Sequence, residues 1–161
     1  MAVDMFLKID GIDGEAQSHK HKGEIELLSF SWGLSQTVAA PGSGGGSGKV
    51  QVSDFSIIKQ IDAASPHLME ACCRGEHIRD VTMTLATKTK GQDYLVVKLN
   101  DCLITSYQTS GGGAGGALPA EQVSFNFSSV QVQAADKNGR FVTDVSCNFA
   151  KFGDGQVGHD H

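Results

Sequence analysis

Two pairs of histidines have a spacing that could bind a metal ion. His19 and His21 form one HxH pair, and His159 and His161 form another near the end of the sequence. On a β-strand, residues two apart point to the same face, so each pair could present two imidazoles together. Both pairs lie in polar, Gly-flanked segments, and the sequence gives neither of them a positioned carboxylate partner. We therefore expect solvated histidines and no metal site.

A glycine-rich run, GGGSGK at 44–49, has residue types that could cradle a phosphate. The phosphate-loop pattern requires Gly where Ser43 stands, and Ser or Thr after the lysine, where Val50 stands. The pattern also opens a helix, whereas the residues after Lys49 alternate as in a strand. We therefore expect no phosphate site. The run is either a flexible hairpin loop or a loop that becomes ordered only against a neighbouring molecule.

No arrangement of residues typical of an enzyme occurs in the sequence. There is no GxSxG or HExxH motif and no pair of carboxylates spaced for acid–base catalysis. Asp10, Asp13 and Glu15 cluster in one loop, which we interpret as a solvated turn. The vicinal Cys72 and Cys73 cannot easily form a disulfide with each other, and no CxxC occurs, so we expect the cysteines to be packing thiols. We expect neither catalysis nor a cofactor.

The 161 residues fit one domain, which we place at 1–152, followed by a flexible tail at 153–161. With 13 basic and 18 acidic residues and no basic stripe, nucleic acid is not an expected partner. The start MAVDMFLKID lacks the apolar core of a signal peptide, and no run approaches the ~20 apolar residues of a membrane helix. We expect a chain that folds in the cytosol without inserting into a membrane. If it leaves the cell, it does so without a cleaved leader.

Two strand-like runs near the start of the sequence flank the loop that contains Asp10, Asp13 and Glu15. In the first run, Val3, Met5, Leu7 and Ile9 share one face, while Phe6 lies on the otherwise polar opposite face. Because exposing an aromatic ring to water is unfavourable, Phe6 is a candidate contact with another subunit.

The second run, residues 25–35, is more apolar than a strand with one face in water needs to be. Ile25 and Leu27 occupy one face, and after a shift of one residue the other face carries Leu28, Phe30, Trp32 and Leu34. The shift indicates a bulge or a strand that is covered on both sides. In a chain of this size, cover on both sides indicates that another subunit supplies some of it. The further candidate subunit contacts are therefore Leu28, Phe30 and Trp32.

The rest of the pattern predicts one helix among several strands. A strand at 49–60 shifts phase near Asp54, and a helix at 62–75 is expected to have Ser65 as its N-cap and Gly75 as its stop. The apolar stripe of that helix comprises Leu68, Met69, Cys72 and Cys73. Further strands follow at 81–85, 94–107, 123–128 and 141–149, and a DKNG turn joins the last two into a hairpin. These elements predict a mainly β fold, an antiparallel β-barrel of about seven or more strands with one flanking α-helix.

Small neutral polar residues concentrate on the faces of three expected strands. Charges are scarce there, and the residues are Ser29, Ser31, Thr82, Thr84, Ser124, Asn126 and Ser128. Such groups suit a wall that faces enclosed water or a weakly held guest, although an ordinary β surface explains them equally well. The glycine-rich loops at 37–48 and 111–116 are likewise either simple linkers or assembly contacts.

Several blocks of the sequence resemble one bacterial family. They are MAVDMFLKI, the GIDGE loop with the following His21, SFSWGLSQ, the glycine-rich loop before KVQV, SPHLMEACCRGEH, YLVVKLNDCLITSY and EQVSFNFSSVQV. In order and spacing they resemble the hemolysin-coregulated proteins (Hcp) of type VI secretion, over nearly the whole chain to about Phe149. The tail GDGQVGHDH does not take part in the resemblance.

The resemblance implies a β-barrel with one flanking helix that forms six-membered rings. The rings would stack into a hollow tube inside a contractile sheath, with a spike protein at the tip, and the expelled tube would carry small effector proteins in its lumen. By position, Ser29 and Ser31 would face the lumen. The loop that would touch the adjacent ring comprises Pro41, Gly42, Ser43, Gly44, Gly45, Gly46, Ser47 and Gly48. The protein would start in the bacterial cytoplasm, be secreted, and act by assembly.

Two alternative functions stay open on the sequence alone. One is a ring-forming chaperone that binds effectors without building a tube, and the other is a hydrolase whose site has no recognisable motif. A discrete ring mass in solution would argue against the hydrolase. Small proteins bound to rings that never stack would favour the chaperone.

Overall fold

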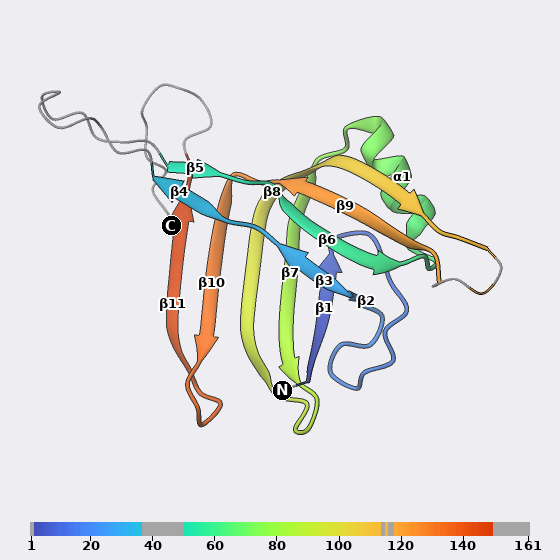
Figure 1. Ribbon diagram of the computed structural model, residues 1–161. Coiled ribbons are helices and arrows are strands. Elements are labelled where there is room, and N and C mark those ends of the chain that lie inside the picture. Colours follow the sequence, from blue (N-terminus) through green and yellow to red (C-terminus); the bar gives the residue numbers. More distant parts are fainter. Residues whose placement is uncertain (1, 37–49, 114, 116–117, 150–161) are drawn as a thin grey trace, which may run out of the picture.

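The computed structural model describes residues 2–36, 50–113, 115 and 118–149, and within them the chain forms one helix and eleven strands (Figure 1). The strands are β1 (Val3–Ile9), β2 (Ile25–Glu26), β3 (Ser29–Ser31), β4 (Leu34–Gln36), β5 (Val50–Val52), β6 (Phe55–Gln60), β7 (Ile78–Thr87), β8 (Asp93–Ser110), β9 (Ala120–Asn126), β10 (Ser129–Ala135) and β11 (Phe141–Asn148). The helix is α1 (Ser65–Arg74). The predicted mainly β class is confirmed.

The 18-residue strand β8 joins two antiparallel sheets. Its first half pairs with β7 and β10, which gives the order β2–β1–β7–β8–β10–β11, called here the long sheet. Its second half pairs with β9 and continues as β8–β9–β6–β3, called here the cross sheet. Figure 1 shows the strands of the long sheet side by side and the cross sheet running obliquely over their upper ends. β4 and β5 form a separate two-stranded ribbon.

The hydrophobic core is shared by the two sheets and the helix. Alternate side chains of each strand point into it, as the period of a strand requires. Fully buried apolar members are Leu7, Ile25, Phe55, Ile57, Leu68, Val81, Met83, Val97, Leu99, Val123 and Phe125. Each such side chain contributes about 1.5–3 kcal/mol by leaving water. This shared apolar layer therefore holds the sheets against each other.

The phase shift in residues 25–35 is a corner where the chain passes from one sheet to the other. The backbone N–H of Leu27 donates to Met5 in β1, and that of Leu28 donates to Ile58 in β6, at 2.9 and 2.7 Å. The side chain of Leu27 is buried, whereas that of Leu28 is exposed. Because successive residues bond to different sheets, the phase shift is a passage between two sheets and not a bulge within one pair of strands. Cover from a second molecule is not needed to explain the shift.

Phe30 and Trp32 lie on the core side of this corner. The Phe30 ring stacks on Phe55 at 6.0 Å between centroids, and Trp32 meets the edge of Phe127 at 6.1 Å. Both side chains are half-buried and pack against the core of their own chain. Both therefore contact the core of their own chain, and their part in a subunit interface stays a prediction, whereas Leu28 is exposed to water in this chain.

The corners also explain why the described strands outnumber the sequence-based estimate. The expected strand 49–60 breaks at Ser53–Asp54 into β5 and β6, as its phase slip predicted. A break at Phe127–Ser128 separates β9 from β10, a strand that the sequence reading missed. The DKNG turn is confirmed with Gly139 at φ 85°, but its first strand is β10. In the described residues the barrel is not closed: β2 and β3 at the two open edges are linked by the chain and not paired with each other.

The helix begins at Ser65, one residue earlier than the predicted Ser65 N-cap implies. Ala64 is its N-cap, and the cap has no side-chain hydrogen bond. The predicted stop is confirmed, because Gly75 has left-handed backbone angles and its N–H caps the last turn. The buried face is formed by Leu68 and Ala71, while Met69 of the predicted stripe is exposed. No helix in the described part of the chain is long and apolar enough to cross a lipid bilayer.

Candidate assembly surfaces and buried polar clusters

β11 is an exposed strand at one edge of the long sheet. It pairs only with β10, and all eight of its residues are exposed. Three of its large apolar side chains face water: Phe141, Val142 and Val145. Among the described residues no strand pairs with its outer backbone edge, and such an edge is a template for association with another chain. The apolar side chains on it indicate an interaction site.

The apolar layer of the core continues outward onto β11. Val130 is buried and Val132 packs against the core. In register, Val130 lies opposite Cys147 and Val132 opposite Val145. Directly paired residues point to the same face of a sheet. Cys147 and Val145 on β11 therefore extend the apolar layer beyond the area that the described chain covers. Uncovered apolar side chains are therefore found on β11 as well as at Leu28 and Leu34 within residues 25–35.

Four serines lie in one row across the outer face of the cross sheet. Ser31, Ser56, Ser124 and Ser106 are paired in register across β3, β6, β9 and β8. The hydroxyls of Ser56 and Ser124 are 2.9 Å apart. The adjacent row is also uncharged and comprises Ser29, Ile58, Gln122 and Gln108. These eight residues, called here the neutral face, bring together part of the polar wall that the sequence predicted.

Other members of the predicted wall lie elsewhere. Thr82 and Thr84 belong to β7 in the long sheet, where Thr84 is buried. Asn126 borders the neutral face at the end of β9. Ser128 lies at the corner between β9 and β10, where its hydroxyl donates to the carboxylate of Asp101 at 3.0 Å. The faces of separate strands could be predicted, but not which strands are neighbours.

His21 is buried, although we expected it to be solvated. Its Nδ1 lies 3.0 Å from Glu24 and its Nε2 lies 2.9 Å from Asp93, so both ring nitrogens face carboxylates. The ring stacks on Phe6 with centroids 4.5 Å apart. Burial by itself lowers the pKa of His21, but the hydrogen bonds and charges of Asp93 and Glu24 outweigh it and raise the pKa. The other member of the pair, His19, is exposed as predicted.

The same contact decides the position of Phe6. Its side chain is 3% exposed, because the loop after β1 folds back and places His21 and Ala16 against it. The predicted role of Phe6 as a subunit contact is therefore replaced by an internal one. The polar composition of the loop predicts that it stays in water, and no pattern in the sequence indicates that the loop covers this face of β1.

A buried ion pair that the sequence reading missed lies where α1 meets the cross sheet. Lys59 and Glu121 are paired in register on β6 and β9, and their charged atoms are 2.7 Å apart. The Lys59 amine also donates to Asp62 at 2.8 Å, and the same Glu121 carboxylate accepts from Ser65 at 2.6 Å and from Tyr107 at 2.5 Å. The alternation could have revealed it, since both charges occupy inward positions of apolar strands.

The hydrogen bonds in this cluster control its ionisation. Burial alone would raise the pKa of Glu121, but the bonds from Lys59, Ser65 and Tyr107 outweigh burial and hold the pKa below its usual value. Burial and the adjacent Glu121 raise the pKa of Tyr107 to about 12. The lowered pKa favours the ionised form of Glu121, and the described donors and acceptors of the cluster satisfy one another. Its evident role is to hold the start of α1 against the strands.

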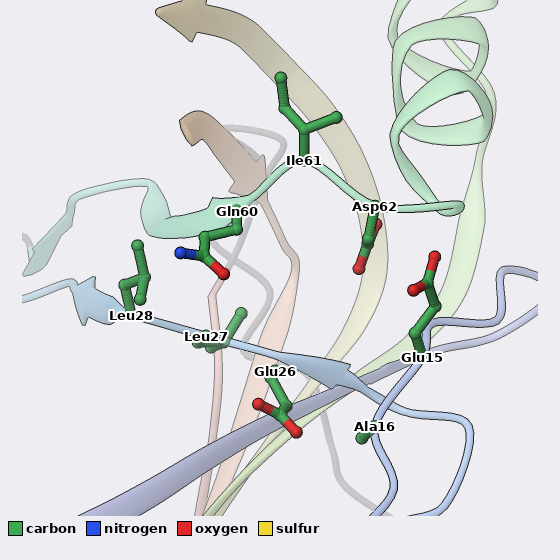
Figure 2. A pocket seen from close by; sticks show the side chains of 8 residues that line it. All are labelled: Glu15, Ala16, Glu26, Leu27, Leu28, Gln60, Ile61 and Asp62. Atoms are coloured by element: carbon green, nitrogen blue, oxygen red, sulfur yellow. The ribbon is translucent and has the colours of Figure 1, made fainter. Parts of the chain in front are cut away.

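A groove of about 260 Å³ opens where the β2–β3 corner faces the link from β6 to α1 (Figure 2). Its lining residues are Glu15, Ala16, Glu26, Leu27, Leu28, Gln60, Ile61 and Asp62. Figure 2 shows Glu15 and Asp62 reaching toward one another from facing walls. Glu15 accepts a hydrogen bond from the backbone N–H of Ala63 at 2.6 Å, so it is not simply a solvated turn residue. The groove is acidic with two exposed apolar side chains, Leu28 and Ile61.

Some predicted sites lie outside the described residues. They are the loop residues Pro41–Gly48, the second histidine pair and the tail at 153–161. Within the described residues, no group of three or more His, Cys, Asp or Glu is arranged to hold a metal ion.

The fold and these surfaces define a class of protein. It is a mainly β chain of two sheets with one flanking helix, in which a bare edge strand and most of an uncharged outer face are accessible. Residues 6–133 match the family model described as "Type VI secretion system effector, Hcp". The chain is 43% identical over 136 residues to Protein hcp1 of Pseudomonas aeruginosa, covering 82% of this chain and 83% of that protein.

Solved structures agree with this match. Hcp1 from Salmonella typhimurium superposes with a TM-score of 0.79 at 35% identity, covering 92% of this chain and 96% of that one. A type VI secretion system effector from Yersinia pestis superposes with a TM-score of 0.76 at 31% identity, covering 90% and 99%. The chain belongs to the Hcp family, the tube proteins of the type VI secretion system.

Proposed function

We propose that six copies of this chain close into a ring, that the rings stack into a hollow tube, and that the tube is secreted without any chemistry of its own. The observation that carries the proposal is the bare β11 edge, where the apolar layer of the core ends in water. A second copy that covers this edge would remove both its apolar surface and its unpaired backbone groups from water. Membership of the tube-protein family supports the same assembly.

We propose that the neutral face lines the lumen of the ring and contacts small effector proteins there. Its eight residues carry hydroxyl, amide and one apolar group and no charge. A wall without charges does not hold cargo by strong ion pairs, so bound proteins could enter and leave. Ser29 and Ser31, both exposed on β3, would be among the contacting residues.

The loop at Pro41–Gly48 is proposed to touch the adjacent ring in the stack. Its composition supports this, because glycine lets a backbone lie close against a partner. A spike protein at the tip and a contractile sheath around the tube are the proposed partners in secretion, and a bacterial cytoplasm is the proposed starting place.

Sedimentation and electron microscopy of the purified chain test this function. The expected result is a species of six times the 17.0 kDa chain mass, seen as rings that form tubes under some conditions. A variant that lacks residues 42–48 should still form rings but should not stack. A well-behaved monomer at high concentration would contradict the proposal. Tubes formed as readily by the deletion variant would contradict the role of the loop.

A further inference from the structure

We propose that β11 of one copy docks on the groove at Leu28 and Ile61 of the next copy around the ring. The inference rests on the proposed ring and names the two surfaces that would make each of its contacts. The occupant of the groove is the start of the edge strand, from Arg140 to Val145, of a second copy of this chain.

The two surfaces lie at opposite edges of the molecule. In the long sheet, β11 forms one edge and β2 the other. The groove is built at the second edge, since Glu26 belongs to β2 and Leu28 follows it directly. A closed ring of identical copies needs two different patches that complement each other, because each copy contacts one neighbour on either side. Surfaces on opposite edges meet this requirement.

Both surfaces expose apolar side chains. On β11, Val142 and Val145 are 59% and 55% exposed. In the groove, Leu28 and Ile61 are 53% and 49% exposed. Contact between the two would take these side chains out of water together, which favours association. Neither surface needs to rearrange the core, because all four side chains are already exposed to water.

The charges of the two surfaces are opposite. Lys137 and Arg140 stand exposed at the start of β11. The groove carries the carboxylates of Glu15, Glu26 and Asp62. Of these, Asp62 is already paired with Lys59, and Glu26 has no ion-pair partner among the described residues. The one acidic residue within β11, Asp144, already accepts hydrogen bonds from two glutamines of β10 at 2.8 and 3.1 Å. Complementary charge of this kind selects a partner and fixes its orientation more than it adds affinity.

Arg140 and Glu26 are suited to a direct test. Both side chains are exposed, and within the described residues neither makes a hydrogen bond or an ion pair. Reversing either charge should therefore leave the fold of the single chain intact. The variants are Arg140→Glu, Glu26→Arg and the double variant with both changes. Arg79→Glu is the matched control, because Arg79 is exposed on β7 away from both surfaces.

Sedimentation velocity over a concentration series measures ring formation, and circular dichroism checks the fold. Each single reversal should raise the concentration at which half of the chain is in rings by about tenfold. The double variant should return that concentration toward wild type, and Arg79→Glu should not change it. Recovery in the double variant would show that the two residues face each other across the interface.

The two failures are distinguishable. If the wild-type chain forms no rings, the proposed function fails and so does this inference. If wild type forms rings and both single variants do so equally well, or if the double variant is no better than the singles, the ring stands but the docking of β11 on this groove is overturned. In that case the groove would be open to another occupant, such as a basic segment of a different protein.

Discussion

At the scale of single residues, the two buried polar clusters could not be predicted from the sequence because each depends on strands that are distant in the chain. Asp93 is 72 residues from His21, and Glu121 is 62 residues from Lys59. The polar neighbours of His21 in the sequence predict a solvated side chain. By contrast, Ser29 and Ser31 were placed on an outward face correctly, because the alternation of a strand is a local property.

His21 should make the stability of the fold depend on pH. Its pKa is raised in the folded chain, so the bridge to Glu24 and Asp93 contributes fully below the unfolded pKa of about 6.5. The contribution is lost as pH rises through the folded pKa. The free energy of unfolding, measured with urea on both sides of this range, should fall with pH more steeply in wild type than in His21→Gln. The exposed control His19→Gln should keep the wild-type slope, and an unchanged slope in His21→Gln would contradict the prediction.

The Lys59–Glu121 pair should be expensive to break. Glu121→Gln removes one of the two carboxylates that pair with the fully buried Lys59 amine and leaves Asp62 as the other. Breaking a buried ion pair in this way costs about 3 kcal/mol. Arg74→Gln is the control, because it removes an exposed pair with Glu70 that is worth about 1 kcal/mol or less. Urea unfolding of the two variants at neutral pH compares them. Equal losses of stability would show that the buried pair is not what holds α1 in place.

At the scale of elements, the regular strands were predictable and the corners were only partly so. β1 and β7 follow from clean alternation, and α1 follows from its apolar stripe and from Gly75. The phase slip near Asp54 predicted the break between β5 and β6. The strand predicted at 123–128 ended at the corner at Phe127–Ser128, and β10 beyond it was not recognised. Which edges remain bare was not predictable, since edges are set by the pairing of the whole sheet.

The loop between β1 and β2 should tolerate no side chain at Gly14. A Cβ built there would lie 2.6 Å from the carbonyl oxygen of Glu24 and 2.7 Å from the Cα of Ile25, and this backbone cannot move without disturbing β2. Gly14→Ala should therefore destabilise the chain by about 1–3 kcal/mol in urea unfolding. Gly112→Ala is the control, because nothing lies within 4 Å of its Cβ position. A Gly14→Ala variant as stable as this control would show that the loop is free to shift.

At the scale of the whole molecule, β8 belongs to both sheets and pairs with three other strands. A pulling force on this strand acts on both sheets at once, because the two share a single backbone. The chain should therefore withstand load up to one threshold and then give way in a single step. In the proposed tube, each copy of the chain would then keep its shape until the moment it fails entirely.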